Sequence, residues 1–412
     1  MFCRIRSLAA IALTFALSSA FGQTIDNNPG LKQEVLDQVT DILSKNAFVP
    51  GVDFGKWPDF LKAEKSEIDA ANNDDDFQKA VNAALKKFGA SHTALNAPRL
   101  ANIRLTGAMV GIGISTHVVP DGLLVTRTVY DAPAERGGIV AGDTITLVDG
   151  KPAKTTAGIE GREGTDVTVT VRHSDKSTED YILTRRKFSA VRQEELHWVD
   201  KNTVRLEIST FGFTYDRARV AGFMNEAQAS QNLILDLREN GGGEIGNLRH
   251  LLGFLVPPSK PVGMFIDRNI FNAYVAANHP PTSDLATIEK GTKIRLQPMT
   301  PDIPVYKGRL IVLIDGQSGS ASEIIAQGLR DVWGAKIIGT KSAGAVLVSL
   351  YVSASNGFYL QYPTSDYVTI NGVRLEGLGV TPDYIVEAPS VHVPNAPDPA
   401  VDKALAVLAG KA

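Results

Sequence analysis

The chain has 412 residues, which is enough for about two or three domains of ordinary size. With 43% hydrophobic and 21% charged residues and a formal net charge of −3, its composition is that of a soluble globular protein. The absence of a basic excess argues against a nucleic-acid partner. The single cysteine, Cys3, precedes an N-terminal apolar run, so a mature chain that begins after this run would have no disulfide and no cysteine nucleophile.

Residues 1–22 are predicted to form a secretory signal peptide. Arg4 and Arg6 precede an apolar run over 8–17, and small residues follow up to a cleavage site after Gly22. The run is shorter than the roughly 20 residues that a membrane-spanning helix needs, which disfavours a retained anchor. We therefore expect an exported protein, periplasmic or extracellular, that is not anchored in a membrane once the signal is removed.

Residues 23–100 are predicted to be a helical lead-in. Apolar residues recur at helical spacing over 31–45, which predicts an amphipathic helix. A second helix is expected over 76–88, with Asp74, Asp75 and Asp76 placed at its positive end. The region closes on the segment 89–93.

Residues 101–188 are predicted to be a small β-rich module. Short β-type runs over 123–128, 144–148 and 166–171 alternate with Gly and Asp turns. The stretch 110–114, together with the later Ala-Pro-Ala-Glu, looks like a PDZ domain. The resemblance implies that a peptide adds as a strand while its terminal carboxylate meets the N–H groups of Gly111, Ile112, Gly113 and Ile114. A glycine-rich hairpin turn is the alternative for each stretch alone.

Residues 189–390 are predicted to be an α/β domain. Continuous apolar runs over 233–237, 310–314 and 336–338 indicate strands buried on both faces, and helical patterns over 245–255 and 322–333 follow two of them. The Pro-rich stretch 261–306 is expected to be an irregular excursion near the site. A tail over 391–412 is expected to carry a short helix over 400–408.

One candidate catalytic segment runs from Asp315 to Ile324, between a buried strand and an amphipathic helix. A serine at a helix N-terminus meets unpaired N–H groups and the helix dipole, which favour the oxyanion formed when its hydroxyl attacks a carbonyl. Serine is also a preferred N-cap residue, which is the structural alternative.

A second candidate segment runs from Leu235 to Gly243 and ends in Asn240 and three glycines. Glycines let the backbone approach a ligand closely and aim N–H groups at developing negative charge. A phosphate-binding loop is the alternative, but the Gly-Lys-Ser/Thr ending of such a loop is missing.

Together the two segments resemble the serine peptidase family that includes the C-terminal processing (tail-specific) peptidases, tricorn and the interphotoreceptor retinoid-binding proteins. The resemblance extends over the expected mature chain, up to the closing stretch 376–383. It implies a multi-domain α+β protein with a ClpP/crotonase-like α/β catalytic domain, and it implies Ser320 as the nucleophile.

The general base departs from the pattern of the processing peptidases. Those enzymes pair the serine with a lysine 25 positions later, and here that position is Ala345, whose methyl group cannot accept a proton. Lys341 lies nearby in sequence, so a Ser/Lys dyad through Lys341 would need a rearranged loop.

The tricorn branch implies a different base. Its motif matches Ser91-His92 and Glu376, so that His92 takes the proton of Ser320, Glu376 orients the imidazole and Ser91 bridges the two. A histidine suits this role because its ordinary pKa, about 6.5, lies near working pH. The same resemblance places the oxyanion hole at the backbone N–H groups of Ala321 and of Gly241 or Gly242.

The sequence thus predicts an exported serine endopeptidase that cleaves unfolded or tail-presented proteins through an acyl-enzyme. Protein or peptide substrates are the expected partners, with no metal, organic cofactor or nucleic acid. One alternative is a binding protein on the same fold that holds a peptide or an apolar ligand at an inactive site. The other is a PDZ-led scaffold that binds peptides without cleaving them.

Overall fold

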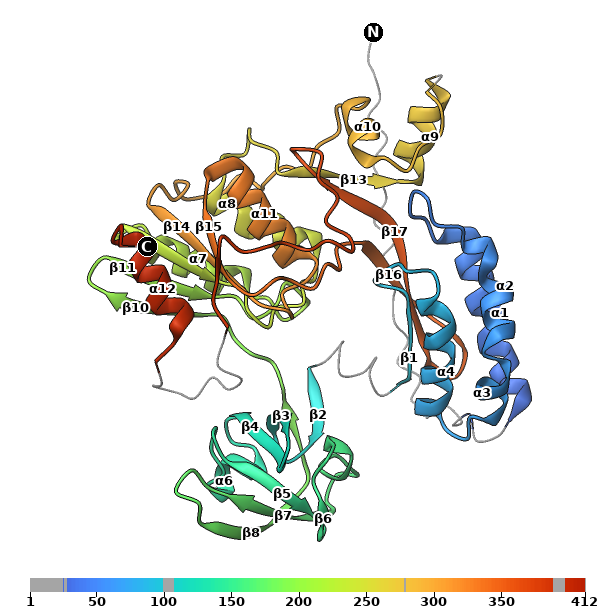
Figure 1. Cartoon of the computed structure of the whole chain (residues 1–412), viewed down its shortest axis with the longest axis vertical. Helices are drawn as coiled ribbons and strands as arrows, with labels where there is room; N and C mark the ends of the chain where they lie inside the picture. The colour runs from blue at the N-terminus through green and yellow to red at the C-terminus, as the bar shows by residue number, and fades with distance from the viewer. Residues whose placement is uncertain (1–24, 26–27, 99–106, 278, 388–396, 412) are drawn as a thin grey trace.

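The computed structural model describes residues 25, 28–98, 107–277, 279–387 and 397–411. Figure 1 shows a helical N-terminal part beside one sheet, a second sheet covered by helices, and a smaller β-rich module between them in the chain. The predicted signal peptide and the predicted start of the mature chain lie outside the described residues. No helix within the described ranges is long and apolar enough to cross a membrane.

Among the described residues, four α-helices and the short 3-10 helix η1 (Phe54–Lys56) form the N-terminal part. The α-helices are α1 (Pro29–Asn46), α2 (Trp57–Ala63), α3 (Lys65–Ala70) and α4 (Asp74–Lys86). Helix α4 begins at Asp74, earlier than predicted, because the side chain of Asn73 accepts a hydrogen bond from the N–H of Asp76 and caps the helix. The three aspartates therefore lie in the first turn, where the helix dipole favours negative charge.

The helices pack on a sheet that the sequence analysis did not predict. Its long strand β17 (Tyr359–Thr369) pairs with β1 (Ala94–Asn96), β13 (Gly263–Asp267) and β16 (Val348–Ser353), all antiparallel. Leu95, Phe358 and Leu360 share one buried core with α1 and α4. This sheet brings the N-terminal segment that carries His92 against the C-terminal half of the chain.

The stretch 261–306 is more regular than predicted. It holds β13, α9 (Arg268–Ala276) and α10 (Leu285–Lys290), and these share a small core with β17. The prolines at 280 and 281 lie between the two helices, where they interrupt no backbone ladder. The first part of the excursion thus extends the sheet, whereas residues 291–306 form no helix or strand and have only an isolated bridge between Leu296 and Gly263.

The β-rich module has its own buried core and two antiparallel sheets. Its elements are β2 (Ala108–Gly111), β3 (Ile114–Val119), β4 (Gly122–Thr128), α6 (Pro133–Gly137), β5 (Thr144–Val148), β6 (Lys151–Pro152), η2 (Thr156–Gly158), β7 (Asp166–Arg172), β8 (Thr178–Thr184) and β9 (Arg186–Ser189). Strand β9 pairs with β2, so the chain enters and leaves the module side by side.

The second sheet has the order β10-β11-β12-β14-β15-β18, parallel except for β10. Its strands are β10 (Glu195–Asp200), β11 (Thr203–Glu207), β12 (Asn232–Asp236), β14 (Arg309–Ile314), β15 (Lys336–Gly339) and β18 (Tyr384–Ile385). Helices α7 (Arg217–Ala227), α8 (Ile245–Leu255) and α11 (Ala321–Trp333) share one core with this sheet, and α12 (Pro399–Leu408) shares another.

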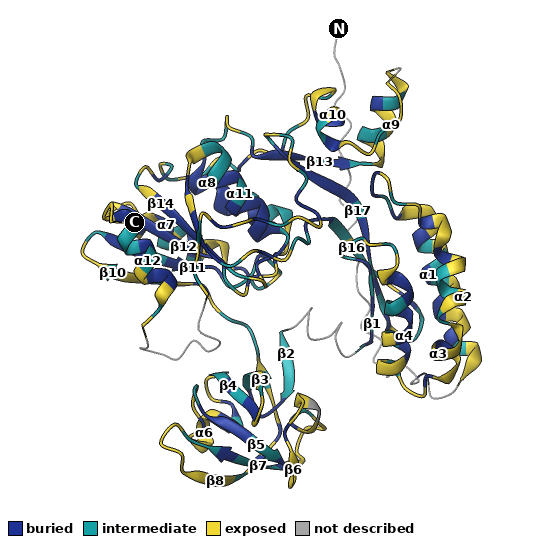
Figure 2. Ribbon diagram, viewed as in Figure 1, coloured by how far each residue is buried: buried dark blue, intermediate teal, exposed yellow. Residues whose placement is uncertain are grey.

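Alternate residues of each central strand serve these two cores. Leu233 and Leu235 of β12 pack toward α8 and α11, whereas Ile234 packs toward α12. Figure 2 shows the central strands as buried throughout. The predicted strands buried on both faces, and with them the mixed α/β fold class, are confirmed.

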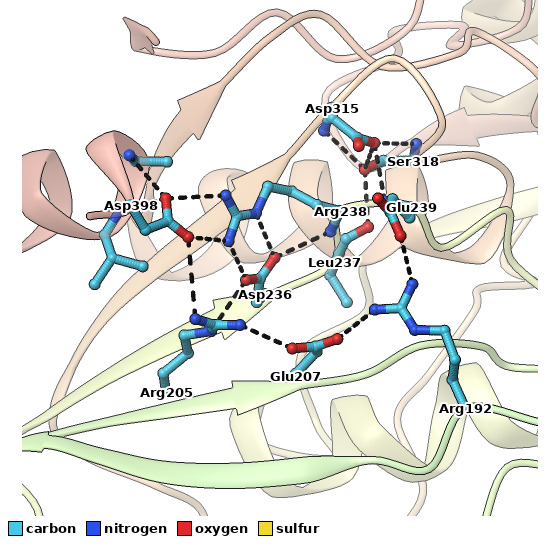
Figure 3. Close-up of polar contacts among 12 residues, drawn as sticks. Arg192, Arg205, Glu207, Asp236, Leu237, Arg238, Glu239, Asp315, Ser318 and Asp398 are labelled. Atoms are coloured by element: carbon cyan, nitrogen blue, oxygen red, sulfur yellow. Dashed lines mark hydrogen bonds and ion pairs between the residues drawn. The ribbon is translucent and has the colours of Figure 1, made fainter. Parts of the chain in front are cut away.

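Helix α12 is joined to the sheet by an ion-pair network, drawn in Figure 3. Arg238 donates to Asp398 at 3.1 and 2.7 Å and to Asp236 at 2.9 and 2.6 Å. Asp398 is also the N-cap of α12 and accepts from the N–H of Ala400. These bonds therefore hold the N-terminus of α12 to Arg238, which lies just before the glycine-rich turn that follows β12.

Candidate active site

Ser320 lies between β14 and α11 in an uncommon backbone conformation. Its φ is 52° and its ψ is −114°, a combination that costs free energy for a residue with a Cβ and that the surrounding structure must hold. Its N–H lies 2.8 Å from the carbonyl of Ala345 and 3.0 Å from Oε2 of Glu323. The conformation places Ser320 at the N-terminus of α11.

The glycine-rich turn after β12 is bound to the segment that carries Ser320. The carbonyl of Asn240 accepts from the N–H of Gly319 at 3.0 Å and from Oγ of Ser322 at 2.8 Å. A Cβ added to Gly242, whose φ is +97°, would lie 2.6 Å from the Cβ of Ser320. Only glycine leaves room for this approach, which explains the residue type at 242.

Three backbone N–H groups were predicted as oxyanion donors, and they differ in what they already bind. The N–H of Gly242 donates to Oδ1 of Asn240 at 2.9 Å and is therefore engaged. Within the part of the chain that the structure describes, the N–H groups of Gly241 and Ala321 have no such acceptor. Of the two glycines, Gly241 is the better placed to donate to a ligand.

His92, Ser91 and Glu376 form a hydrogen-bonded chain. Oγ of Ser91 lies 2.8 Å from Nδ1 of His92 and 2.8 Å from Oε2 of Glu376. Glu376 also accepts from the N–H of Ser91 and from the N–H of Val346, each at 2.8 Å. Ser91 therefore bridges the histidine and the glutamate, the arrangement that the family resemblance implies.

This chain of bonds determines the tautomer of the neutral His92 imidazole. All three partners of Glu376 are donors, which suits the ionised carboxylate because it can only accept. The Ser91 hydroxyl gives its one proton to Glu376 and must accept from Nδ1–H of His92. The lone pair of the neutral imidazole then lies on Nε2.

His92 and Ser320 line the same cavity, which has a volume of about 750 Å³. Gly241, Gly242, Ala321 and Ala345 line it as well. The structure therefore brings together residues from the N-terminal lead-in, the turn after β12 and the start of α11. Glu376 lies behind His92 and is 7% exposed.

Apolar side chains and one strand complete the cavity in ways that the sequence analysis did not anticipate. Leu248 and Ile324 line it from α8 and α11, and residues 348–351 of β16 line it from the first sheet. Phe213 and Leu350 also line it and are largely exposed. The strand β16, Val-Ser-Leu-Tyr-Val-Ser, carries residues typical of strands but was not predicted. Its place beside the cavity follows from its pairing with β17.

The alternative base, Lys341, is exposed and does not line the cavity. Ala345, at the position where the processing peptidases carry lysine, does line it. Among the described residues that line the cavity there is no lysine. Nor do the described residues include a group of three or more His, Cys, Asp or Glu side chains that could hold a metal ion.

The predicted peptide-binding stretch of the β-rich module joins β2 to β3. Gly113 has a φ of +76°, and its carbonyl accepts from the N–H of Val129 at 2.8 Å. The side chain of Ile112 is buried in the core of the module, and Ile114 begins β3, an edge strand that pairs with β4. Gly111 ends β2.

Comparison with known proteins bears on the domain that carries Ser320. Residues 202–386 match the model of peptidase family S41. A probable CtpA-like serine protease of Staphylococcus aureus is 27% identical over 304 residues, which are 71% of this chain and 56% of that protein. The chain thus spans about half the length of the curated relatives it matches.

Two solved structures share the fold. The photosystem II D1 C-terminal processing protease is 21% identical with a TM-score of 0.52, over 87% of this chain and 93% of that one. The tricorn protease is 15% identical with a TM-score of 0.50, over 92% of this chain and 37% of that one. At these identities the likeness shows the fold alone.

Proposed function

We propose that this chain, whose residues 202–386 match the model of peptidase family S41, is a serine endopeptidase that hydrolyses peptide bonds through an acyl-enzyme on Ser320. The observation that carries the proposal is the cavity shared by Ser320 and His92, behind which Ser91 and Glu376 form a hydrogen-bonded chain. In this arrangement Ser320 is the nucleophile, His92 is the base and Glu376 is the carboxylate that orients the imidazole.

In the proposed mechanism, Nε2 of His92 accepts the proton of the Ser320 hydroxyl as Oγ attacks the carbonyl carbon of the substrate. The N–H groups of Ala321 and Gly241 stabilise the oxyanion that develops. The imidazolium then gives its proton to the leaving amine, and a water molecule hydrolyses the ester by the same steps in reverse order. Glu376 stabilises the imidazolium through Ser91.

An extended substrate segment suits the edge of β16. Among the described residues β16 pairs only with β17. Ser349 lies opposite Pro363, which has no N–H and whose carbonyl accepts from the N–H of Phe48 at 2.9 Å. Pro363 therefore cannot donate a backbone bond to the carbonyl of Ser349 at this pair. A substrate strand could bind there by pairing with the backbone.

We propose that unfolded or tail-presented proteins are the substrates and that the β-rich module acts as a PDZ domain that recruits them. This proposal is supported by the position of β3, an edge strand that follows the turn at Gly111 to Gly113 and beside which a peptide can add as a further strand. The N-terminal sequence, with two arginines before an apolar run, supports export to the periplasm or the cell exterior.

The test is a comparison of variants on an unfolded protein substrate, with products identified by mass spectrometry and Ser320 labelled by a fluorophosphonate. Ser320→Ala is expected to lower turnover by about 10⁴- to 10⁶-fold, and His92→Ala by nearly as much. Lys341→Ala is the matched control and should retain wild-type turnover. Retained turnover in His92→Ala with loss in Lys341→Ala would favour the Ser/Lys dyad.

A binding protein on the same fold is the second candidate, and the apolar lining of the cavity by Leu248, Phe265 and Ile324 is the observation that favours it. Such a protein would hold an apolar ligand or a peptide and leave it intact. Failure of the fluorophosphonate to label Ser320 in the folded, full-length protein would support this candidate over the peptidase.

A further inference from the structure

Glu323 is a fully buried carboxylate beside the candidate nucleophile, and the mechanism above does not use it. It lies in the first turn of α11 and is 0% exposed. Its Oε2 accepts from the N–H groups of Ser320 and Ala345, each at 3.0 Å. Its Oε1 accepts from Oγ of Ser342 at 2.5 Å and from the N–H of Gly344 at 2.8 Å.

The four partners of Glu323 are all donors, so the site is built for the ionised carboxylate. A protonated carboxyl group would direct its O–H at one of these donors. Burial raises the pKa of Glu323, and the bonds from Ser342, Gly344, Ala345 and Ser320 act against that rise. The pKa of Glu323 stays above its usual range, so the four bonds offset the desolvation of a charge next to Ser320 only in part.

Helix capping explains one of the four hydrogen bonds to Glu323 but does not explain the other three. A glutamate at the third position of a helix commonly accepts from the N–H of the N-cap residue, as Glu323 does from Ser320. The other three donors belong to the loop 342–345, which lies outside the helix. Glu323 therefore joins two separate segments that both line the cavity through Ser320 and Ala345.

A third segment is connected through the same loop. Oγ of Ser342, which donates to Glu323, accepts from the N–H of Val380 at 2.6 Å. The carbonyl of Gly344 accepts from the N–H of Gly377 at 2.8 Å. Residues 376–380 carry the glutamate that holds Ser91. A short path of hydrogen bonds thus runs from the backbone of Ser320 to the segment of Glu376.

We propose that Glu323 is a positioning residue of this site, which holds the backbone of Ser320 in register with the loop 342–345 and, through Ser342, with the Glu376 segment. Its effect on catalysis rests on the proposed function. Glu323 contacts neither substrate nor the reacting atoms. Without its carboxylate, the N–H groups of Gly344 and Ala345 lose their acceptor and the φ of +52° at Ser320 loses a restraint.

The variants that test this are Glu323→Gln and Ser342→Ala in the full-length protein. Glu323→Gln keeps the shape but turns one acceptor into a donor that faces donors. We expect kcat to fall by about 10²-fold, with KM within about threefold, because a small displacement of the nucleophile affects the chemical step. Ser342→Ala removes both the bond to Glu323 and the link to Val380 but leaves the other three donors of Glu323 in place, so we expect kcat to fall by only about tenfold.

Amide hydrogen exchange by mass spectrometry provides a readout that does not depend on activity. In Glu323→Gln, exchange should become faster in peptides covering 342–346 and 376–380. The control is Gln327→Ala, which removes a bond to Asp331 within α11 and should leave both peptides and kcat unchanged. Circular dichroism establishes that each variant is folded. If Glu323→Gln does not fold, Ser342→Ala is the variant on which exchange and kcat are measured.

The outcomes separate this inference from the proposed function. Unchanged exchange and unchanged kcat in both variants would overturn the positioning role. Exchange that rises across the whole chain, as stability falls, would also overturn it and leave an ordinary structural role. If exchange rises locally while the wild-type protein neither cleaves nor labels, the link between the segments stands and the peptidase proposal fails.

Discussion

Ser91 and Glu376 are 285 positions apart in the chain and share two hydrogen bonds, from the N–H and from Oγ of Ser91, each 2.8 Å long. The antiparallel pairing of β1 with β17 holds the N-terminal segment at this place. Because the Ser91 hydroxyl is oriented by Glu376, it can act on Nδ1 of His92 only as an acceptor. Several consequences can be measured.

Ser91→Ala should weaken the base without removing it. The imidazole loses its partner at Nδ1 and both tautomers become accessible, so we expect kcat to fall by about 10- to 10²-fold, less than for His92→Ala. Ser91→Thr keeps a hydroxyl and is the matched control, which should recover most of the loss. Equal loss in Ser91→Thr and Ser91→Ala would show that packing, rather than the hydroxyl, matters at this position.

Gly242→Ala should damage the site with a single methyl group. The new Cβ would lie 2.6 Å from that of Ser320, and the φ of +97° is unfavourable for alanine. We expect about 10²-fold lower kcat and a loss of about 1 to 3 kcal/mol in the free energy of unfolding.

A glycine in a helix provides the comparison for that variant. Gly222 lies in α7, and a Cβ added there meets nothing within 4 Å. Gly222→Ala should therefore leave kcat unchanged and raise stability slightly, because alanine is the better helix former. Urea unfolding and steady-state kinetics on both variants decide whether the effect at 242 is local.

Asp398→Asn should loosen the C-terminal helix. Burial acts to raise the pKa of Asp398, but the hydrogen bond and the charge of Arg238 outweigh it and hold the pKa below its usual range. The stabilisation is therefore present above the unfolded-state pKa, about 3.9, and is lost as pH falls through the folded-state value. We expect Asp398→Asn to lower the free energy of unfolding by about 1 to 3 kcal/mol at pH 7 and by less at acid pH.

The control for the C-terminal helix is Asp402→Asn, since Asp402 lies exposed in the first turn of the same helix. Removal of the Asp402 charge should change the free energy of unfolding by no more than about 0.5 kcal/mol. Equal effects of Asp398→Asn and Asp402→Asn in urea unfolding at pH 7 would contradict a specific role for the Arg238 pair.

His173 should give the β-rich module a pH-dependent stability. Its Nδ1 lies 3.0 Å from Oδ1 of the buried Asp143, and this hydrogen bond raises the pKa of His173. The stabilisation is complete below the unfolded-state pKa, about 6.5, and is lost as pH rises through the folded-state value. The difference in melting temperature between wild type and His173→Asn should therefore be larger at pH 5.5 than at pH 8.5. A constant difference would contradict the charged pair.

Several elements could be predicted nearly to the residue because their signals are local. Helix α8 has the predicted bounds, Ile245 to Leu255, and β14 begins one residue before its apolar run. A strand buried on both faces appears as a continuous apolar run whatever its neighbours are. Strand β17 lacks such a run, since its eleven residues include Pro363 and Asp366, and it was missed.

The sequence by itself determined the chemistry that is available: a serine after a buried strand, glycines beside it, a histidine in the lead-in and an alanine where the related peptidases carry lysine. Only the tertiary structure decided which of these groups meet. Long-range pairing of β1 with β17 places His92 on the wall of the Ser320 cavity and Ser91 on Glu376. The buried charge of Glu323 became significant in the same way, because its four donors come from two segments that are adjacent only after folding. Hydrogen bonds and burial depend on distance in space, which no local pattern of residues encodes.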